Sequence, residues 1–328
     1  MQNSHVNQIA SILDKNHNFI LTTHLNPDGD GIGSQVAFYH YLKKRGKNVT
    51  ILNVDTIPKS LKFLENGCAI TLFDENRHRS LVQNADIILI LDISDWKRLQ
   101  RLGDIVRESN VETVCIDHHL LEQQFSDHDF VFPVASSTGE LIYDLFTGLH
   151  ADFSKEICDG ILTAVMSDTG CFRFTNTSPK VFEIAAEMQR LGADRKMIYS
   201  ELYENQDMPR IRLLARVLNN LHLDCGGKIA WMEVNQKMLK ETGAILKDTE
   251  GLADFPRRIQ DVEISILFME LPDNKVKISF RSRGIVAINN LAGRFGGGGH
   301  AFASGASVEG NLSSVIEDVL FQAHHLFE

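Results

Sequence analysis

The chain has 328 residues, of which 43% are hydrophobic and 23% charged, and its formal net charge is −10. This length is sufficient for two domains with separate cores, and the composition is ordinary for a soluble globular protein. The acidic balance argues against extended binding of long DNA or RNA, which usually needs a basic surface, but it allows a small anionic substrate held by metal ions and arginines.

The five cysteines are dispersed and form no Cys-x-x-Cys pair, which is typical of reduced thiols in a cytosolic protein. Residues 1–13 lack the basic start and long apolar stretch of a signal peptide. No apolar run approaches the roughly 20 residues of a membrane span. We therefore expect a cytoplasmic protein without a membrane segment.

The first half of the chain alternates apolar runs with helical patterns. Helices are expected at residues 6–13, 31–45, 139–146, 155–166 and 179–190. Strands are expected at 19–22, 49–54, 85–91 and 111–116. Residues 61–79 contain some helix and an exposed charged loop at 74–79. Strands buried on both faces that alternate with helices predict a doubly wound parallel sheet.

The second half has a different texture. Strands are expected at 228–234, 262–269 and 275–281, and helices at 288–295 and 312–327. Asp273 and Asn274 predict a hairpin turn between the last two strands, and the helices should cover one face of a small mixed sheet. We assign residues 1–191 to an α/β domain, 192–221 to a connecting segment that ends in a helix, and 222–328 to a smaller α/β domain, with a cleft between the domains.

The first strand is followed by one imidazole and two carboxylates, His24, Asp28 and Asp30, on a turn that contains Pro27 and Gly29. This ligand mixture suits a hard or borderline divalent cation better than a cation that prefers thiolates. Turns rich in Asx, Pro and Gly are also common without any ligand, so the stretch alone leaves both interpretations open.

Acids and imidazoles also follow the two clearest strands. Asp92 comes directly after one, Asp117, His118 and His119 come at the end of the other, and Asp168 follows a helix. Because the carboxyl ends of parallel strands meet at one edge of a sheet, where ligands bind, we expect these side chains to converge.

Two divalent cations about 3.5–4 Å apart need a bridging carboxylate and several further ligands, and they generate a hydroxide from water. The candidates divide as follows: His24 and Asp28 for one metal, Asp30, His118 and Asp168 for the other, and Asp92 for both.

Each candidate has a plainer alternative. Asp92 could be a helix cap or turn residue, a strand-end histidine could lie on the surface, and Asp168 could start a turn. Asp117 could orient its neighbours as a hydrogen-bond acceptor rather than bind metal. Together, these alternatives would require four independent loops to place acids and imidazoles at one edge by chance.

A second cluster lies near the C-terminus, where Gly296, Gly297, Gly298 and Gly299 precede His300. Successive glycines let backbone N–H groups approach an anion closely. A flexible turn is the alternative. We expect Arg281, upstream, to contact substrate, against the alternative of a solvated charge.

Taken together, the motifs His24-x-x-Pro27-Asp28-x-Asp30, Asp92, Asp117-His118-His119 and Asp168-Thr169-Gly170 resemble those of the DHH phosphoesterase family, and the glycine run resembles the DHH-associated C-terminal domain. The resemblance covers almost the whole chain. It implies a two-manganese site with the ligand division given above, and His119 in contact with the scissile phosphate or the leaving group. It further implies that the second domain closes over the cleft and binds a terminal nucleotide or phosphate through Arg281, Gly297, Gly298, Gly299 and His300.

Within this family, a compact two-domain chain looks most like the NrnA-type nano-RNases. That resemblance implies a hydrolase that degrades oligoribonucleotides of two to five nucleotides (nanoRNA) exonucleolytically to mononucleotides, and that removes the 3′-phosphate of phosphoadenosine phosphate. The alternatives are a phosphodiesterase for linear or cyclic dinucleotide second messengers and a non-catalytic nucleotide-binding module. The partners would be short RNA or small nucleotides, without long duplexes or membranes. The sequence leaves open the native metal, the cleavage polarity and a homodimer.

Overall fold

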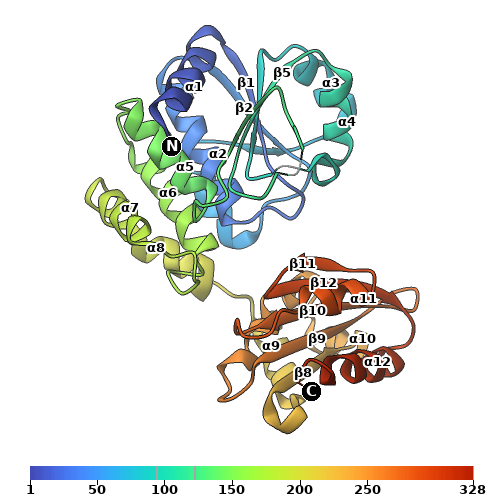
Figure 1. Cartoon of the computed structure of the whole chain (residues 1–328). Coiled ribbons are helices and arrows are strands. Elements are labelled where there is room, and N and C mark those ends of the chain that lie inside the picture. Colours follow the sequence, from blue (N-terminus) through green and yellow to red (C-terminus); the bar gives the residue numbers. More distant parts are fainter. Residues whose placement is uncertain (94, 122, 328) are drawn as a thin grey trace. The chain divides into compact units, whose positions relative to one another are not determined.

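The structure of the chain is a computed structural model that describes residues 1–93, 95–121 and 123–327. It consists of two compact units, Met1–Asn205 and Gln206–Glu328, each with its own sheet and core (Figure 1). Within the described ranges, no helix is long and apolar enough to cross a membrane.

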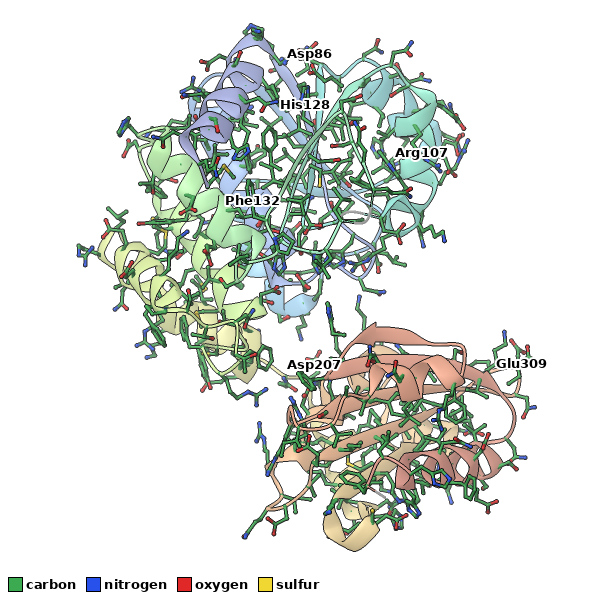
Figure 2. All side chains as sticks on the ribbon, in the orientation of Figure 1. Asp86, Arg107, His128, Phe132, Asp207 and Glu309 are labelled. Carbon is green, nitrogen blue, oxygen red and sulfur yellow. The ribbon has the colours of Figure 1, made fainter. Side chains whose placement is uncertain are left out.

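The first unit contains a parallel sheet with the strand order β3-β2-β1-β4-β5-β6. Its strands are β1 (Asn18–Thr22), β2 (Asn48–Asn53), β3 (Ile70–Leu72), β4 (Ile87–Leu91), β5 (Glu112–Asp117) and β6 (His128–Val131). Asp86, labelled in Figure 2, accepts the backbone N–H groups of His17 and Asn18 and so joins the start of β4 to the start of β1. The strand order reverses between β1 and β4, which is where ligands bind in open sheets of this kind.

Helices cover both faces of this sheet. They are α1 (Asn3–Lys15), α2 (Gly29–Lys44), α3 (Glu75–Gln83), α4 (Gln100–Glu108), α5 (Thr138–Gly148), α6 (Lys155–Asp168), α7 (Pro179–Arg190) and α8 (Arg195–Tyr199), with the shorter turns η1 (Lys59–Glu65), η2 (Trp96–Leu99) and the π-helical η3 (Ser200–Glu204). Alternate residues of β4 enter different cores: Leu89 packs with α2, α5 and α6, whereas Ile88 and Ile90 pack with α3 and α4. The predicted doubly wound α/β fold is confirmed.

Residues 74–79, which we expected to form an exposed charged loop, instead begin helix α3. The Asp74 side chain accepts the backbone N–H of Arg77 at 3.0 Å and caps the helix. Its charges pair across the surface, with Glu75 bound by Arg79 and Arg101. Capping and ion pairs thus support a helix that carries few apolar residues, of which Val82 is buried.

Helices α2 and α6 approach each other at backbone contact distance. A Cβ added to Gly33 of α2 would lie 2.3 Å from the carbonyl oxygen of Gly160 in α6, and a Cβ added to Gly160 would lie 2.6 Å from the carbonyl oxygen of Gly33. The N-terminal turn of α2 carries Asp30, and the C-terminal turn of α6 ends at Asp168. The glycine contact therefore sets the separation of two predicted metal ligands.

The second unit contains a mixed sheet with the order β11-β12-β10-β9-β8-β7, in which β8 and β9 are parallel and the other pairs antiparallel. The strands are β7 (His222–Asp224), β8 (Ile229–Val234), β9 (Ile264–Leu271), β10 (Lys275–Ser282), β11 (Gly298–His300) and β12 (Ala303–Glu309). The helices are α9 (Met208–Asn219), α10 (Gln236–Thr242), α11 (Asn289–Arg294) and α12 (Leu312–His324), with short turns η4 (Cys225–Gly227), η5 (Leu246–Thr249), η6 (Leu252–Asp254) and η7 (Pro256–Arg258).

The predicted hairpin between β9 and β10 is confirmed, with positive φ at Asp273 and Asn274. As predicted, α11 and α12 cover one face of the sheet, where Phe268 and Phe280 are fully buried. Helices α9 and α10 pack on the other face against β8 and β9. Residues 192–221, predicted to connect the domains, supply α8 and η3 to the first unit and α9 to the second.

Candidate metal centre

The predicted metal-binding side chains of the first unit gather at the carboxyl edge of three adjacent strands. His24 follows β1, Asp92 follows β4, and β5 ends in Asp117 and is followed by His118. The strands are each buried on both faces, so their ends are fixed by the core beneath them. The edge therefore presents these side chains from a rigid support.

The first group comprises His24, Asp28 and Asp92, with ligand atoms within 4.8 Å of one another. Nε2 of His24 lies 3.4 Å from Oδ2 of Asp92 and 3.8 Å from Oδ2 of Asp28. Nδ1 of His24 donates to the carbonyl oxygen of Leu25 at 2.8 Å, so Nε2 carries the lone pair. Oδ1 of Asp28 caps α2, which begins two residues earlier than expected, and Oδ2 remains for the site.

The second group comprises Asp30, His118 and Asp168, again within 4.8 Å. Nε2 of His118 lies 3.0 Å from Oδ2 of Asp168 and 3.6 Å from Oδ2 of Asp30. This nitrogen is buried, yet it has no hydrogen bond of good geometry within the described residues. Buried polar atoms are normally satisfied, and a ring nitrogen surrounded by carboxylate oxygens fits a divalent cation.

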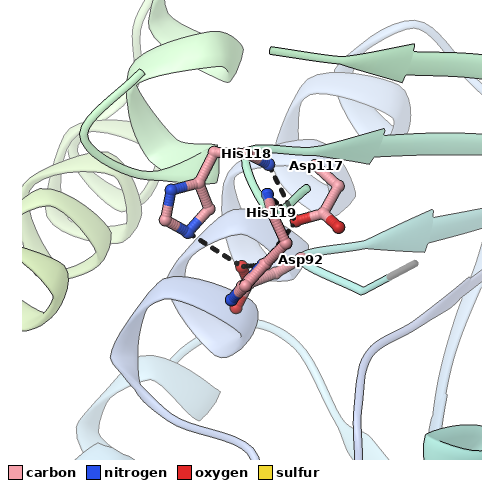
Figure 3. A group of neighbouring side chains, drawn as sticks. All are labelled: Asp92, Asp117, His118 and His119. Carbon is pink, nitrogen blue, oxygen red and sulfur yellow. Dashed lines mark hydrogen bonds and ion pairs between the residues drawn. The ribbon is translucent and has the colours of Figure 1, made fainter. Parts of the chain in front are cut away.

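Asp92 belongs to the surroundings of both groups. Its Oδ2 faces His24, and its Oδ1 lies 3.6 Å from Nε2 of His118 (Figure 3). The residue has φ of +61° and is almost fully buried. Because its two oxygens face different histidines, this one carboxylate is shared by the two groups.

Asp117 organises the loop that carries both histidines. Its Oδ1 accepts the backbone N–H of His118 at 2.7 Å, the N–H of His119 at 3.1 Å and the ring Nδ1–H of His119 at 2.8 Å (Figure 3). With Nδ1 engaged, Nε2 of His119 is the ring atom left for other contacts, and the side chain is 35% exposed. A third group with metal-ligand spacing contains both residues together with Asp92 and His118.

The carboxylates crowd one another electrostatically. Burial, followed by the charges of Asp92 and Asp168, raises the pKa of Asp30 well above its usual value. Burial and the charges of Asp28 and Asp168 act in the same way on the pKa of Asp92. Burial alone would lower the pKa of His118, but the neighbouring carboxylates outweigh it and raise this pKa to about 9. The residues therefore fit a group of positive charge at this position.

The sequence did not predict several groups that hold the proposed metal-binding residues in position. The backbone N–H groups of Thr138 and Gly139, at the start of α5, donate to the two oxygens of Asp30 at 2.7 and 2.8 Å. Nδ2 of Asn176 donates to the carbonyl oxygens of Ser136 (3.0 Å) and Asp168 (3.1 Å). The helix start could have been recognised from the residues Ser137-Thr138-Gly139-Glu140, whereas nothing in the sequence singles out Asn176.

The remaining predicted residues lie in the second unit. Arg281 of β10 is opposite Ala303 of β12, which is opposite His300 of β11, so Arg281 and His300 share one face of the sheet. Nε of Arg281 lies 3.8 Å from Oδ2 of Asp254. Arg283, in contrast, donates to backbone carbonyl groups and stabilises the fold.

The glycines of the run have different surroundings: some pack against the sheet and others are exposed. A Cβ at Gly297 would lie 2.1 Å from the carbonyl oxygen of Gly305, so Gly297 packs directly on β12. A Cβ at Gly298 would meet no atom within 4 Å. Gly299 has φ of +137°, a backbone conformation that other residues rarely adopt.

Comparisons with known proteins agree with this architecture. The profile described as DHH family, N-terminal domain, matches residues 18–167, and that of the DHHA1 domain matches residues 226–327. The chain is 32% identical over 303 residues to the bifunctional oligoribonuclease and PAP phosphatase NrnA of Thermus thermophilus. The match covers 92% of this chain and 87% of that protein. It is 28% identical to the protein of the same name from Bacillus subtilis, with 88% of each chain covered.

The crystal structure of an exopolyphosphatase-related protein from Bacteroides fragilis is also similar. It has a TM-score of 0.94 and 30% sequence identity, and the match covers 100% of this chain and 98% of that one. The family resemblance predicted from the motifs is confirmed: the chain belongs to the DHH phosphoesterase family and carries a DHHA1 domain.

Proposed function

We propose that this protein is a metal-dependent phosphoesterase that hydrolyses oligoribonucleotides of two to five nucleotides and removes the 3′-phosphate of phosphoadenosine phosphate. The similarity to the two NrnA proteins, over most of each chain, supports this substrate class. The shared position of Asp92 between two ligand groups supports the chemistry and is the observation on which the proposal depends.

The proposed ligand division follows the two groups. His24 and Asp28 hold one metal, Asp30, His118 and Asp168 hold the other, and Asp92 contacts both. We propose Mn²⁺ as the native ion, because mixed imidazole and carboxylate ligands suit it, although Mg²⁺ and Co²⁺ accept similar ligands. Two such ions, when bound, would supply activation of a water molecule and would neutralise the charge that develops on the phosphoryl group.

The protein's own residues position the substrate. Asp117 holds Nδ1 of His119, which leaves Nε2 to contact a phosphate oxygen or the leaving 3′-oxygen. The first unit is thereby assigned the chemistry. The second unit is assigned substrate binding, through the Arg281 and His300 side chains and the backbone N–H groups of Gly297, Gly298 and Gly299.

We also propose that the protein acts in the cytoplasm. All five cysteines are free thiols, and three of them are buried, which suits a reducing compartment.

The decisive experiment incubates the protein with Mn²⁺, Mg²⁺ or Co²⁺ and, in parallel, with a labelled diribonucleotide, phosphoadenosine phosphate, a cyclic dinucleotide, pyrophosphate and polyphosphate. We expect mononucleotides from the diribonucleotide and AMP from phosphoadenosine phosphate, with the highest rate in Mn²⁺. Phosphate release from pyrophosphate or polyphosphate alone would refute the proposed substrate class. Faster turnover of the cyclic dinucleotide would assign the enzyme to second-messenger hydrolysis.

A further inference from the structure

A strained turn follows Asp168 directly. Three consecutive residues, 170–172, have φ between +57° and +67°. The backbone N–H groups of Arg173 and Phe174 then both donate to the carbonyl oxygen of Thr169 at 2.9 Å, which closes the turn. Two of the three left-handed residues are not glycine. Such strain persists only where the surroundings enforce it, and it gathers near functional sites.

This turn places an aromatic ring and a cation on the surface. The ring of Phe174 lies against the backbone of Gly170, because a Cβ built on that glycine would approach the ring carbons to 2.5 Å. Phe174 nevertheless remains 41% exposed. The guanidinium carbon of Arg173 lies 5.1 Å from the centre of the Phe174 ring, and this side chain is exposed as well.

A second aromatic side chain is anchored at the same end of α6. The hydroxyl of Tyr203, in the π-helical η3, donates to the carbonyl oxygen of Met166 at 3.2 Å, two residues before Asp168. Burial raises the pKa of Tyr203 to about 12. Among the nearby charges, Arg173 lowers this pKa and Asp168 raises it. The Tyr203 ring is 38% exposed and lies 5.2 Å from the ring of Tyr199.

We propose that Arg173, Phe174 and Tyr203 form a stacking surface for the nucleobase that adjoins the scissile phosphate. The inference rests on the proposed function. Aromatic rings and arginine guanidinium groups bind unpaired bases by stacking, which tolerates every base and requires no Watson–Crick contact.

The placement of the surface gives it a direct role in the reaction. Phe174 and Tyr203 are each fixed to the backbone at the end of α6 that carries Asp168. A base stacked there keeps its own phosphate beside the proposed metal ligands. The surface therefore selects a nucleoside phosphate over an inorganic phosphate chain, and an unpaired strand over a duplex.

The test combines loss of the ring with loss of the base. Wild type and Phe174→Ala are assayed with Mn²⁺ on a diribonucleotide and on two versions in which one nucleotide, 5′ or 3′, is abasic. Removal of one of the two bases should lower kcat/KM of the wild type about fivefold or more. Phe174→Ala should lower kcat/KM on the complete substrate by a similar factor. On the substrate that lacks the stacked base, Phe174→Ala and the wild type should have equal kcat/KM.

Two further variants keep the test independent of folding. Arg173→Gln changes an exposed side chain, and it should raise KM about two- to fivefold only for substrates that retain the stacked base. Phe321→Ala removes a ring that is 61% exposed on α12 of the second unit, and it should match the wild type on all three substrates. Equal losses on complete and abasic substrates, or no loss in either variant, would overturn the stacking surface.

Binding of a product analogue separates this inference from the proposed function. The 5′-monophosphate of 2-aminopurine riboside contains no internucleotide bond, and its fluorescence falls when the base stacks. Wild type should quench it, and Phe174→Ala should need about fivefold more protein for half-quenching. Quenching without hydrolysis of any oligonucleotide would refute the function but keep the surface. Hydrolysis without quenching, and without dependence on the base, would refute the surface alone.

Discussion

Oδ1 of Asp92 lies 3.6 Å from Nε2 of His118, a buried ring nitrogen without a well-formed hydrogen bond to any residue in the described ranges. The other oxygen of the same carboxylate faces His24. A single side chain thus connects the two ligand groups, and its replacement should affect both.

Replacement of Asp92 by asparagine tests this shared role more specifically than replacement by alanine. At φ of +61°, asparagine is tolerated whereas alanine is strained, so Asn keeps the backbone and removes the charge. We expect kcat to fall about a hundred- to a thousandfold, the range for loss of one preorganised electrostatic group. Bound Mn²⁺, measured by plasma emission spectrometry, should fall from two ions to one or none. Wild-type turnover together with two bound ions would contradict the shared role of Asp92.

The pH dependence of stability has a defined sign in the metal-free protein. The pKa of His118 is raised from 6.5 to about 9, so its contribution to stability is complete below pH 6.5 and is lost as the pH rises through 9. The pKa values of Asp30 and Asp92 are also raised by folding. Above the pKa of the unfolded carboxyl groups, they therefore also lower the stability as the pH rises. With EDTA, the melting temperature should therefore fall between pH 6.5 and 9.

Mn²⁺ should oppose this loss, because its ligands bind in their deprotonated forms and metal uptake releases protons. Calorimetric titration in two buffers of different ionisation enthalpy would measure that release at pH 7.5. A melting temperature that rises with pH in EDTA would be the opposite of the expected result.

Asn176→Ala should weaken metal binding without touching a ligand side chain. Nδ2 of Asn176 joins the carbonyl groups of Ser136 and Asp168, and so ties the loop before α5 to the end of α6. Loss of groups that orient metal ligands typically lowers metal affinity about 10- to 100-fold. We expect the Mn²⁺ concentration for half-maximal activity to rise by at least tenfold, and kcat at saturating metal to change less. Asn84→Ala, which removes a bond to Ser80 at the end of α3, serves as the control.

Alanine variants of the neighbouring residues Gly297 and Gly298 distinguish an effect on packing from an effect on substrate binding. Gly297→Ala should lower the melting temperature, because the new methyl group would meet the carbonyl oxygen of Gly305. Gly298→Ala meets no protein atom, so it should leave the melting temperature unchanged. If substrate approaches the backbone here, KM for a diribonucleotide should rise several-fold in Gly298→Ala. An unchanged KM in that variant would remove the glycine run from the substrate site.

Much of the arrangement could be predicted because parallel strands with apolar sequences end at one edge. His24, Asp92 and His118 converge for that reason, and the apolar runs before them specify the strands. Asp168 could be added because a clear helical pattern precedes it. The mixed sheet could be predicted where alternation was strong, as in β10, where buried residues alternate with exposed or half-buried ones.

Other parts carry no comparable signal. β12 consists largely of alanine, glycine and serine, which have little strand propensity, and it forms a strand because its backbone pairs with β10 from Lys275 to Arg281. The residues around Ser137 mark the helix start that supplies the N–H groups for Asp30, but nothing in the sequence shows that this helix start meets Asp30. Asn176 acts through two carbonyl groups that only the fold brings together.

The contact between Gly33 and Gly160 has a consequence for how such chains are recognised. A methyl group at position 33 would act as a wedge between α2 and α6, and it would move Asp30 and Asp168 apart while every acid and imidazole of the motifs stayed in place. A chain judged by its ligand motifs alone would then look intact although the group of Asp30, His118 and Asp168 had been widened. Two residues that offer no side chain are therefore as diagnostic of a working centre as the histidines and aspartates themselves.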